Sequence, residues 1–145
     1  MKRLAIPLIL STALAMASLA QNATTDDEVA ARNTALGVAG AFGNDGFKLR
    51  DGNWAGTLAP GKPQILQVNL YAGNQYWFTL GATPAGKKLA VSVYDETGKP
   101  IETESYQDAS VAAAGFAPQA SGPYYVKIEV VDGAPTAFCL IYSYK

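Results

Sequence analysis

The chain has 145 residues, of which 49% are hydrophobic and 16% are charged, and this length suits one domain with a single core. Its 11 basic and 12 acidic residues are scattered without a basic stripe, so nucleic acid is not an expected partner. The chain has no histidine and a single cysteine, Cys139, which excludes Ser-His-Asp and Cys-His catalysis and an internal disulfide. No cofactor is expected from these residues.

Residues 1–20 have the organisation of a secretory signal peptide. Two basic residues after Met1 precede an uncharged apolar stretch that ends at Met16, and small residues follow at the positions that a signal peptidase reads. A transmembrane anchor is the alternative, but the apolar stretch is short and contains Pro7. We expect cleavage before Gln21, which leaves about 125 residues with a net charge near −3 in the periplasm or outside the cell. No later segment is apolar and long enough to span a bilayer.

Residues 21–45 form a helical or linker segment. Thr25 and Glu28 fit a capping box, in which each side chain accepts a hydrogen bond from the backbone N–H of the other residue. The following stretch to Phe42 is rich in alanine, although glycines weaken it as a helix. Its apolar residues do not form one clean stripe. We predict a short helix packed on the rest of the protein, with a mobile linker as the alternative.

Residues 46–145 form a ladder of short strands separated by turns rich in Gly, Pro and Asp. Apolar side chains occupy every second position in five stretches, so one face of each strand can enter a core. Those stretches are Leu66–Leu70, Tyr76–Leu80, Leu89–Val93, Tyr124–Val130 and Phe138–Tyr142. The pattern predicts an all-β, jelly-roll-like antiparallel β-sandwich of about eight strands.

Two details of the strand pairing also follow from the sequence. Ala72-Gly73-Asn74 is the tightest candidate hairpin and would join two neighbouring strands. A weak, exposed strand around Ile101–Glu104 and the C-terminal strand are the candidate sheet edges. Cys139 lies within an apolar run, where we expect it to be a small buried hydrophobic residue.

The order of several short motifs resembles the bacterial pre-peptidase C-terminal (PPC) domain, a jelly-roll β-sandwich usually attached to secreted proteases and other exported enzymes. The motifs run from a Trp-x-Gly-x-Leu opening to a closing Gly-Pro-Tyr-Tyr-Val-x-Ile strand, so the resemblance covers Trp54 to Tyr144. They are Trp54–Leu58, Pro60-Gly61, Leu70–Phe78, Val91–Gly98 and Gly122–Ile128. Here the domain is expected to stand alone, without an attached protease.

The chain departs from this family at a calcium-related position. Members often carry an Asp-x-Asp pair before the Tyr-Asp-x-x-Gly turn, where this chain has Lys88 and Ala90. A hard cation needs several oxygen ligands, and a lysine at this position adds repulsion. We therefore expect no metal site here.

Outward aromatic residues are the candidate ligand-binding residues. If Tyr76 faces the core, Trp77 points outward beside Gln75, and on a later strand Tyr125 alternates outward with Lys127. Such residues can stack on a sugar or anchor a protein partner. The alternative is that Trp77 lies under the N-terminal segment or against the second sheet.

The sequence favours an exported, non-catalytic binding or interaction domain whose ligand is a polysaccharide or another exported protein. The alternative is a structural or self-assembling envelope protein that pairs through a strand edge. Glu102 and Glu104 would share one face of a strand and could act as an acid/base pair, but on an exposed strand they indicate a solvated face.

Overall fold

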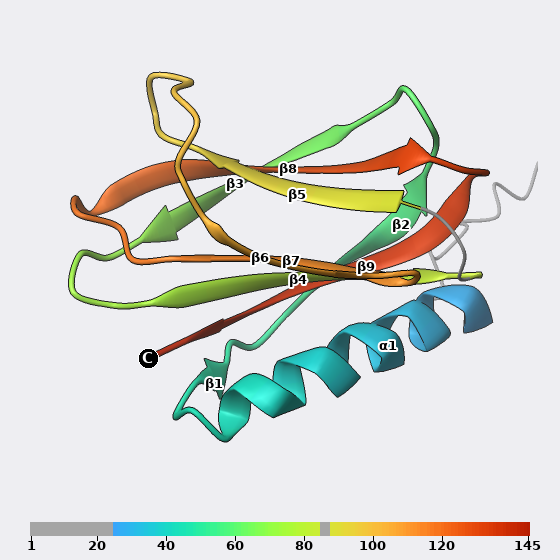
Figure 1. Cartoon of the computed structure of the whole chain (residues 1–145), viewed down its shortest axis with the longest axis horizontal. Coiled ribbons are helices and arrows are strands. Elements are labelled where there is room, and N and C mark those ends of the chain that lie inside the picture. The colour runs from blue at the N-terminus through green and yellow to red at the C-terminus, as the bar shows by residue number, and fades with distance from the viewer. Residues whose placement is uncertain (1–24, 85–87) are drawn as a thin grey trace, which may run out of the picture.

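The computed structural model describes residues 25–84 and 88–145, in which one helix packs against a sandwich of two antiparallel sheets (Figure 1). The predicted signal peptide, residues 1–20, lies outside the described residues. Both sheets contribute to one core, so the prediction of an all-β sandwich is confirmed. Among the described residues, no helix combines the length and the hydropathy that crossing a membrane requires.

The larger sheet has the strand order β1-β9-β4-β7-β6, with β2 also paired to β9, and the smaller sheet has the order β3-β8-β5. In chain order the elements are α1 (Asp26–Gly43), β1 (Lys48–Leu49), β2 (Trp54–Leu58), β3 (Gln64–Leu70), β4 (Tyr76–Thr83), β5 (Lys88–Tyr94), β6 (Glu104–Asp108), β7 (Val111–Phe116), β8 (Gly122–Asp132) and β9 (Thr136–Tyr144).

The predicted alternation of side chains is present in the strands that form the core. In β8 the buried residues alternate with partly exposed ones, and Val126 and Ile128 are fully buried between the sheets. Phe78 and Leu80 of β4 enter the same core, as does Leu140 of β9. These residues are the expected ones, because apolar side chains at every second position of a strand share one face.

Two predictions about strand pairing are wrong. Ala72-Gly73-Asn74 does not form a hairpin, because β3 and β4 lie in different sheets and the turn crosses between them. The C-terminal strand β9 is not an edge, since it pairs with β4 on one side and with β1 and β2 on the other. Both β4 and β9 are buried along almost their whole length, and a strand covered on both faces belongs in the middle of a sheet.

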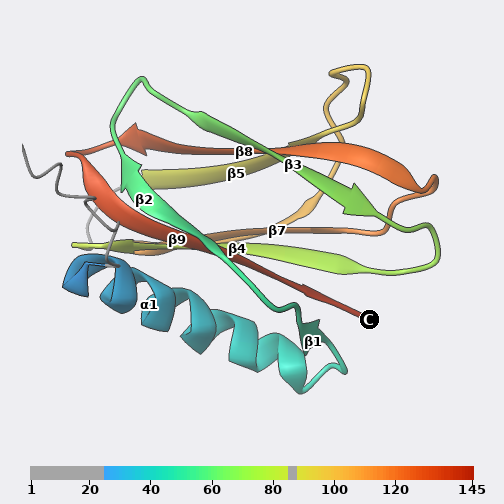
Figure 2. The ribbon, with the colours of Figure 1, turned by 180° about the vertical axis from the view of Figure 1, so that it is seen from behind.

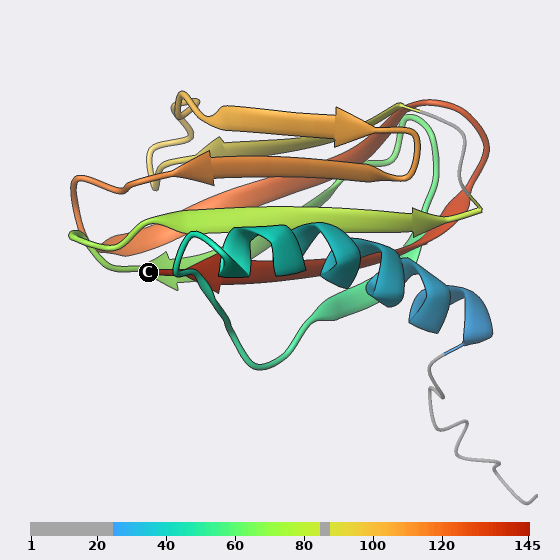
Figure 3. The ribbon, with the colours of Figure 1, turned by 60° about the horizontal axis from the view of Figure 1, so that its bottom comes forward.

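The helix α1 covers the outer face of β4 and β9, and the prediction of a helix packed on the sandwich is confirmed (Figure 3). Its first turn is capped by Thr25, whose hydroxyl oxygen accepts a hydrogen bond of 3.1 Å from the Glu28 backbone N–H. The face that packs on the sheet consists of small residues at every fourth position, Ala31, Ala35 and Ala39. This narrow alanine stripe explains why the larger apolar residues of the helix do not align.

Gly81 of β4 allows the helix to approach the sheet this closely. A Cβ atom at this position would overlap the Ala31 carbonyl oxygen and would lie 2.8 Å from the Ala35 backbone nitrogen. Cys139 is buried beneath the helix together with Ile141, as the apolar run around it predicts. At Gly81 the helix backbone therefore lies directly against the backbone of the sheet, and alanine methyl groups, Cys139 and Ile141 fill the neighbouring space.

Candidate functional site

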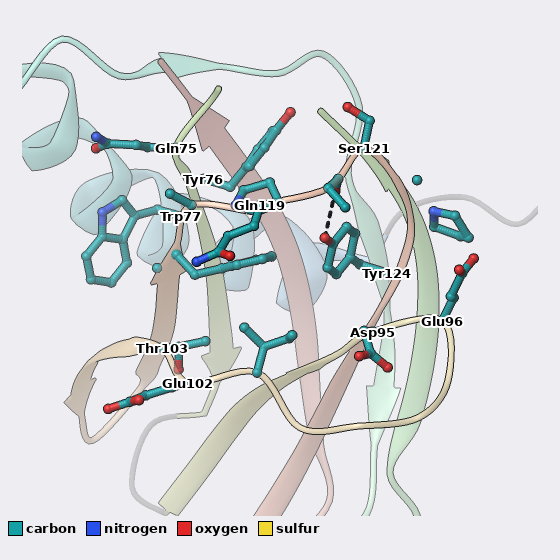
Figure 4. A pocket seen from close by; sticks show the side chains of 18 of the residues that line it. Gln75, Tyr76, Trp77, Asp95, Glu96, Glu102, Thr103, Gln119, Ser121 and Tyr124 are labelled. Atoms are coloured by element: carbon teal, nitrogen blue, oxygen red, sulfur yellow. Dashed lines mark hydrogen bonds between the residues drawn. The ribbon is translucent and has the colours of Figure 1, made fainter. Parts of the chain in front are cut away.

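An open groove of about 880 Å³ lies at one end of the sandwich (Figure 4). Its two walls are connections between strands: residues 95–103 join β5 to β6, and residues 117–121 join β7 to β8. The groove is also lined by three side chains that pack on the core or are buried in it: Ile101 of the first wall, and Phe116 and Tyr124 of the strands that flank the second wall. Loops held on a rigid sheet scaffold are the common location of binding sites in β-sandwiches.

The first wall is ordered by Asp95. Its Oδ1 atom accepts hydrogen bonds from the Thr97 backbone N–H at 2.9 Å, the Thr97 hydroxyl at 2.7 Å and the Lys99 backbone N–H at 2.9 Å. These bonds, the Thr97 hydroxyl first among them, hold the pKa of the Asp95 carboxyl below its ordinary value of 3.8. Gly98 completes the turn at a φ of 81°, a conformation that glycine adopts without steric cost.

The second wall is tied to the sandwich by two side chains. The Tyr124 hydroxyl donates a hydrogen bond of 2.7 Å to the Ala120 carbonyl oxygen. The Ser121 hydroxyl oxygen accepts one of 2.8 Å from the Ala72 backbone N–H, which joins this wall to the turn between β3 and β4. Both walls are thus held in place by hydrogen bonds before any ligand is present, which lowers the entropic cost of binding.

The groove is acidic. Four carboxylates lie along it, and no lysine or arginine is among the described residues that line it. The carboxylates are Asp95, Glu96, Glu102 and Glu104. Asp95 already uses Oδ1 within its own loop, so the three glutamates, which accept no hydrogen bond from their own loops, are the main groups available to a ligand. Amide groups at Gln75 and Gln119 add both donors and acceptors (Figure 4).

Glu102 and Glu104 are not placed as the alternation predicts. Glu102 lies in the connection that precedes β6, and Glu104 is the first residue of that strand. Both side chains are exposed and both line the groove. The predicted strand around Ile101 begins three residues later because the Ile101 backbone N–H donates to the Val93 carbonyl oxygen at 2.8 Å, which fixes the chain against β5.

Trp77 and Gln75 lie at the end of the groove nearest the helix (Figure 4). The Trp77 indole stacks on the Phe42 ring of α1, with centroids 4.5 Å apart and an angle of 15° between the planes. It also lies over Gly115, where a Cβ atom would come within 2.5 Å of the indole carbons. Trp77 is therefore packed beneath the end of the N-terminal helix, as the alternative interpretation predicts, and remains half-buried.

Tyr125 and Lys127 lie elsewhere, on the outer face of the smaller sheet. Tyr125 stands opposite Tyr94 on one neighbouring strand and opposite Gln67 on the other. The Lys127 ammonium lies 3.4 Å from the Glu129 carboxylate. The four predicted site residues thus form two separate pairs, Gln75 with Trp77 in the groove and Tyr125 with Lys127 on the outer face of the smaller sheet.

Sequence reasoning missed most of the groove, because its walls are loops without apolar periodicity. The one local signal was Tyr-Asp-x-x-Gly at Tyr94–Gly98, which marks the turn that Asp95 orders. Which loops meet at one end of a sandwich depends on strand order, and strand order is not encoded in alternation. The carboxylates of residues 96–104 could be read from the sequence only as solvent-exposed charges.

Within residues 25–84 and 88–145, no group of three or more Cys, Asp and Glu side chains is arranged to hold a metal ion. Lys88 begins β5 and stands opposite Asp132 of β8, and Ala90 stands opposite Glu129. Neither position contributes an oxygen ligand from its side chain.

A scan against protein-family models finds no match to this chain, and neither does a comparison with curated protein sequences. Among solved structures, the fold is similar to the pre-peptidase C-terminal domain of collagenase from Bacillus anthracis. The two share 16% sequence identity at a TM-score of 0.50, over 63% of this chain and 87% of that domain. At this sequence identity the similarity is one of fold, and the fold is the one that the sequence motifs predict. The chain is a β-sandwich similar in architecture to a PPC domain.

Proposed function

We propose that this protein is an exported, non-catalytic binding domain that holds part of another extracellular macromolecule in the groove between the β5–β6 and β7–β8 connections. The observation that carries the proposal is the groove itself, whose walls are ordered by their own hydrogen bonds and whose described lining offers carboxylates without cations. The absence of histidine from the chain supports a role without catalysis. The basic and apolar start of the chain supports export.

The charges of the groove narrow the ligand class. Glu96, Glu102 and Glu104 would repel an acidic polysaccharide and attract a lysine- or arginine-containing segment of another exported protein. An uncharged polysaccharide is also compatible, because carboxylates and amides accept hydrogen bonds from sugar hydroxyls. Trp77 offers less to a sugar than an open indole would, since Phe42 already stacks on it.

Binding to arrays of neutral glycans and of basic peptides, each at low and at physiological salt, tests the proposal. We expect the double substitution Glu102→Gln and Glu104→Gln to weaken binding of a basic peptide by about tenfold, with the effect reduced in higher salt. The double substitution Asp26→Asn and Asp27→Asn is the matched control, because it removes the same number of charges from the exposed first turn of α1, away from the groove. If the Glu102→Gln, Glu104→Gln variant bound the peptide as tightly as the wild type, the groove would not be the binding site.

The outer face of the smaller sheet is a second candidate surface for a polysaccharide. Tyr125 and Tyr94 stand side by side there, with Gln67 and Lys127 next to Tyr125 in the sheet. Two neighbouring tyrosines on an exposed sheet can stack on successive sugar rings. Glycan binding lost in Tyr125→Ala but kept in Trp77→Ala would assign the ligand to this face.

A further inference from the structure

The four lateral edges of the two sheets differ in how well they are protected against pairing with another chain. An open edge presents unpaired backbone N–H and C=O groups, and proteins cover such edges, place charges on them or bend them. Three of the four edges among the described strands carry such protection, and the fourth, β3, does not.

The edge formed by β5 is closed by hydrogen bonds from its own chain. The Gln107 side-chain amide donates to the Leu89 carbonyl oxygen at 2.8 Å, and the Ile101 backbone N–H donates to the Val93 carbonyl oxygen, also at 2.8 Å. These two bonds occupy carbonyl groups that an added strand would need.

The edge formed by β6 is protected by charge. If two copies paired symmetrically and antiparallel about Tyr106, Glu104 of one copy would stand opposite Asp108 of the other. Two like charges at both ends of a five-residue strand oppose that pairing. The β1–β2 edge carries Lys48 and Arg50, and its Thr57 carbonyl oxygen accepts a bond of 2.9 Å from the Gln64 side chain.

The β3 edge has none of these features. Its seven residues, Gln64–Leu70, include no charged residue and no proline, and they pair with β8 alone (Figure 2). Within the described part of the chain, no backbone group of β3 takes part in a hydrogen bond outside that pairing. Ile65 on the outer face is 63% exposed.

The sequence of β3 is compatible with itself in an antiparallel register centred on Gln67. In that register Leu66 of one copy stands opposite Val68 of the other, on the faces that point into the two cores. Gln67 stands opposite its own counterpart on the outer face, where two side-chain amides can exchange hydrogen bonds. Leu66 is only partly buried at the open edge and would gain cover from the second copy.

We infer that two copies of this protein associate through their β3 strands, so that their two three-stranded sheets form one continuous antiparallel sheet across a two-fold axis. The pairing is of the strand-addition type, in which main-chain hydrogen bonds give affinity and side chains set the register. Isologous contact is the common form of such dimers. The grooves are built from other strands and connections, so the inference stands independently of the ligand proposed for them.

Light scattering and sedimentation of the purified protein over a wide concentration range test this inference. We expect a monomer–dimer equilibrium in the wild type, and a dissociation constant raised at least about tenfold in Gln67→Lys and in Gln67→Glu, because each places like charges at the two-fold axis. An equimolar mixture of the two variants should recover dimers, since the introduced lysine and the introduced glutamate then meet as opposite charges in mixed pairs.

Gln67 is exposed, so both variants should fold, which circular dichroism and the Tm will check. Ser105→Lys on the exposed β6 edge is the matched control and should leave the dissociation constant unchanged. A wild type that stays monomeric at every concentration would overturn the inference. The inference would also be overturned if Gln67→Lys formed dimers as readily as the wild type. It would be overturned equally if the mixture of Gln67→Lys and Gln67→Glu formed no dimers.

Discussion

The indole of Trp77 stacks on the phenyl ring of Phe42 at a centroid distance of 4.5 Å, which fastens the last turn of α1 to the larger sheet. Phe42 also meets Phe47 edge-on at 6.3 Å, just after the helix ends. This aromatic cluster adds to the contacts of Leu36 and of the alanine stripe, through which the helix packs on Cys139 and Ile141. The cluster lies beside the groove, so it joins the helix to the candidate site.

Replacing Phe42 should therefore loosen the helix. We expect Phe42→Ala to lower the free energy of unfolding by about 1–3 kcal/mol, because a half-buried ring and its stacking partner are lost. Urea unfolding measures this change. Val29→Ala is the control at the exposed start of the helix and should change stability by less than about 0.5 kcal/mol. An equal loss in both variants would show that the stacking does not hold the helix.

Gly81 should tolerate no side chain. We expect Gly81→Ala to destabilise the fold by about 1–3 kcal/mol, because its methyl group would collide with the backbone of Ala31 and Ala35. Gly40→Ala is the matched control: nothing lies near a Cβ atom there, and alanine is the better helix former, so stability should rise by about 0.5–1 kcal/mol. Urea unfolding should therefore show a loss of stability for Gly81→Ala and a gain for Gly40→Ala, and a change in the same direction for both variants would contradict this account.

Thr79 lies under the helix with a hydroxyl group that is fully buried and has no hydrogen-bond partner among the described residues. Thr79→Val replaces this hydroxyl by a methyl group of similar size, so we expect stability to rise by about 1 kcal/mol. Thr79→Ser keeps the hydroxyl and loses the methyl group, and should lower stability. If urea unfolding showed a lower stability for Thr79→Val than for the wild type, the Thr79 hydroxyl would have a hydrogen-bond partner in solution.

Burial raises the pKa of the Cys139 thiol to about 11. Its ordinary value is 9.0, so near neutral pH the thiolate is scarcer than in an exposed cysteine, and the helix also covers the sulfur. We expect alkylation of Cys139 to be slow in the wild type and faster in Gly81→Ala, in which the helix is displaced. Equal rates in the two proteins, followed by mass spectrometry, would show that the helix does not protect the thiol.

The Asp95 carboxyl has a pKa below 3.8 in the folded protein because it accepts hydrogen bonds from the Thr97 side chain and from the Lys99 and Thr97 backbone. A carboxyl with a lowered pKa stabilises the fold above its unfolded-state pKa, and that contribution is lost as the pH falls through the folded value. The stability difference between wild type and Asp95→Ala should thus be constant near neutral pH and shrink below pH 3.8. A difference that grows on acidification would contradict this assignment.

The sandwich could be predicted from the sequence because Val126, Ile128 and their counterparts alternate with polar residues along each strand. Strand order could not, since the alternation of β3 and β4 is the same whether they form a hairpin or lie in different sheets. The close approach of α1 was also hidden, because it depends on Gly81, which meets Ala31 and Ala35 only in the folded state. The groove could not be predicted for the same reason as the strand order, because each of its walls is a connection that passes from one sheet to the other.

Chemical-shift mapping of backbone amides is the sharpest test of whether a ligand occupies the groove. The protein would be titrated with an oligolysine peptide and, separately, with a neutral oligosaccharide. We expect the shifts to concentrate at Gln75, Glu102 and Gln119 for one of these probes, and to weaken in the Glu102→Gln, Glu104→Gln variant. Shifts confined to Tyr125 and Lys127 on the outer face of the smaller sheet, or no shift with either probe, would contradict binding in the groove.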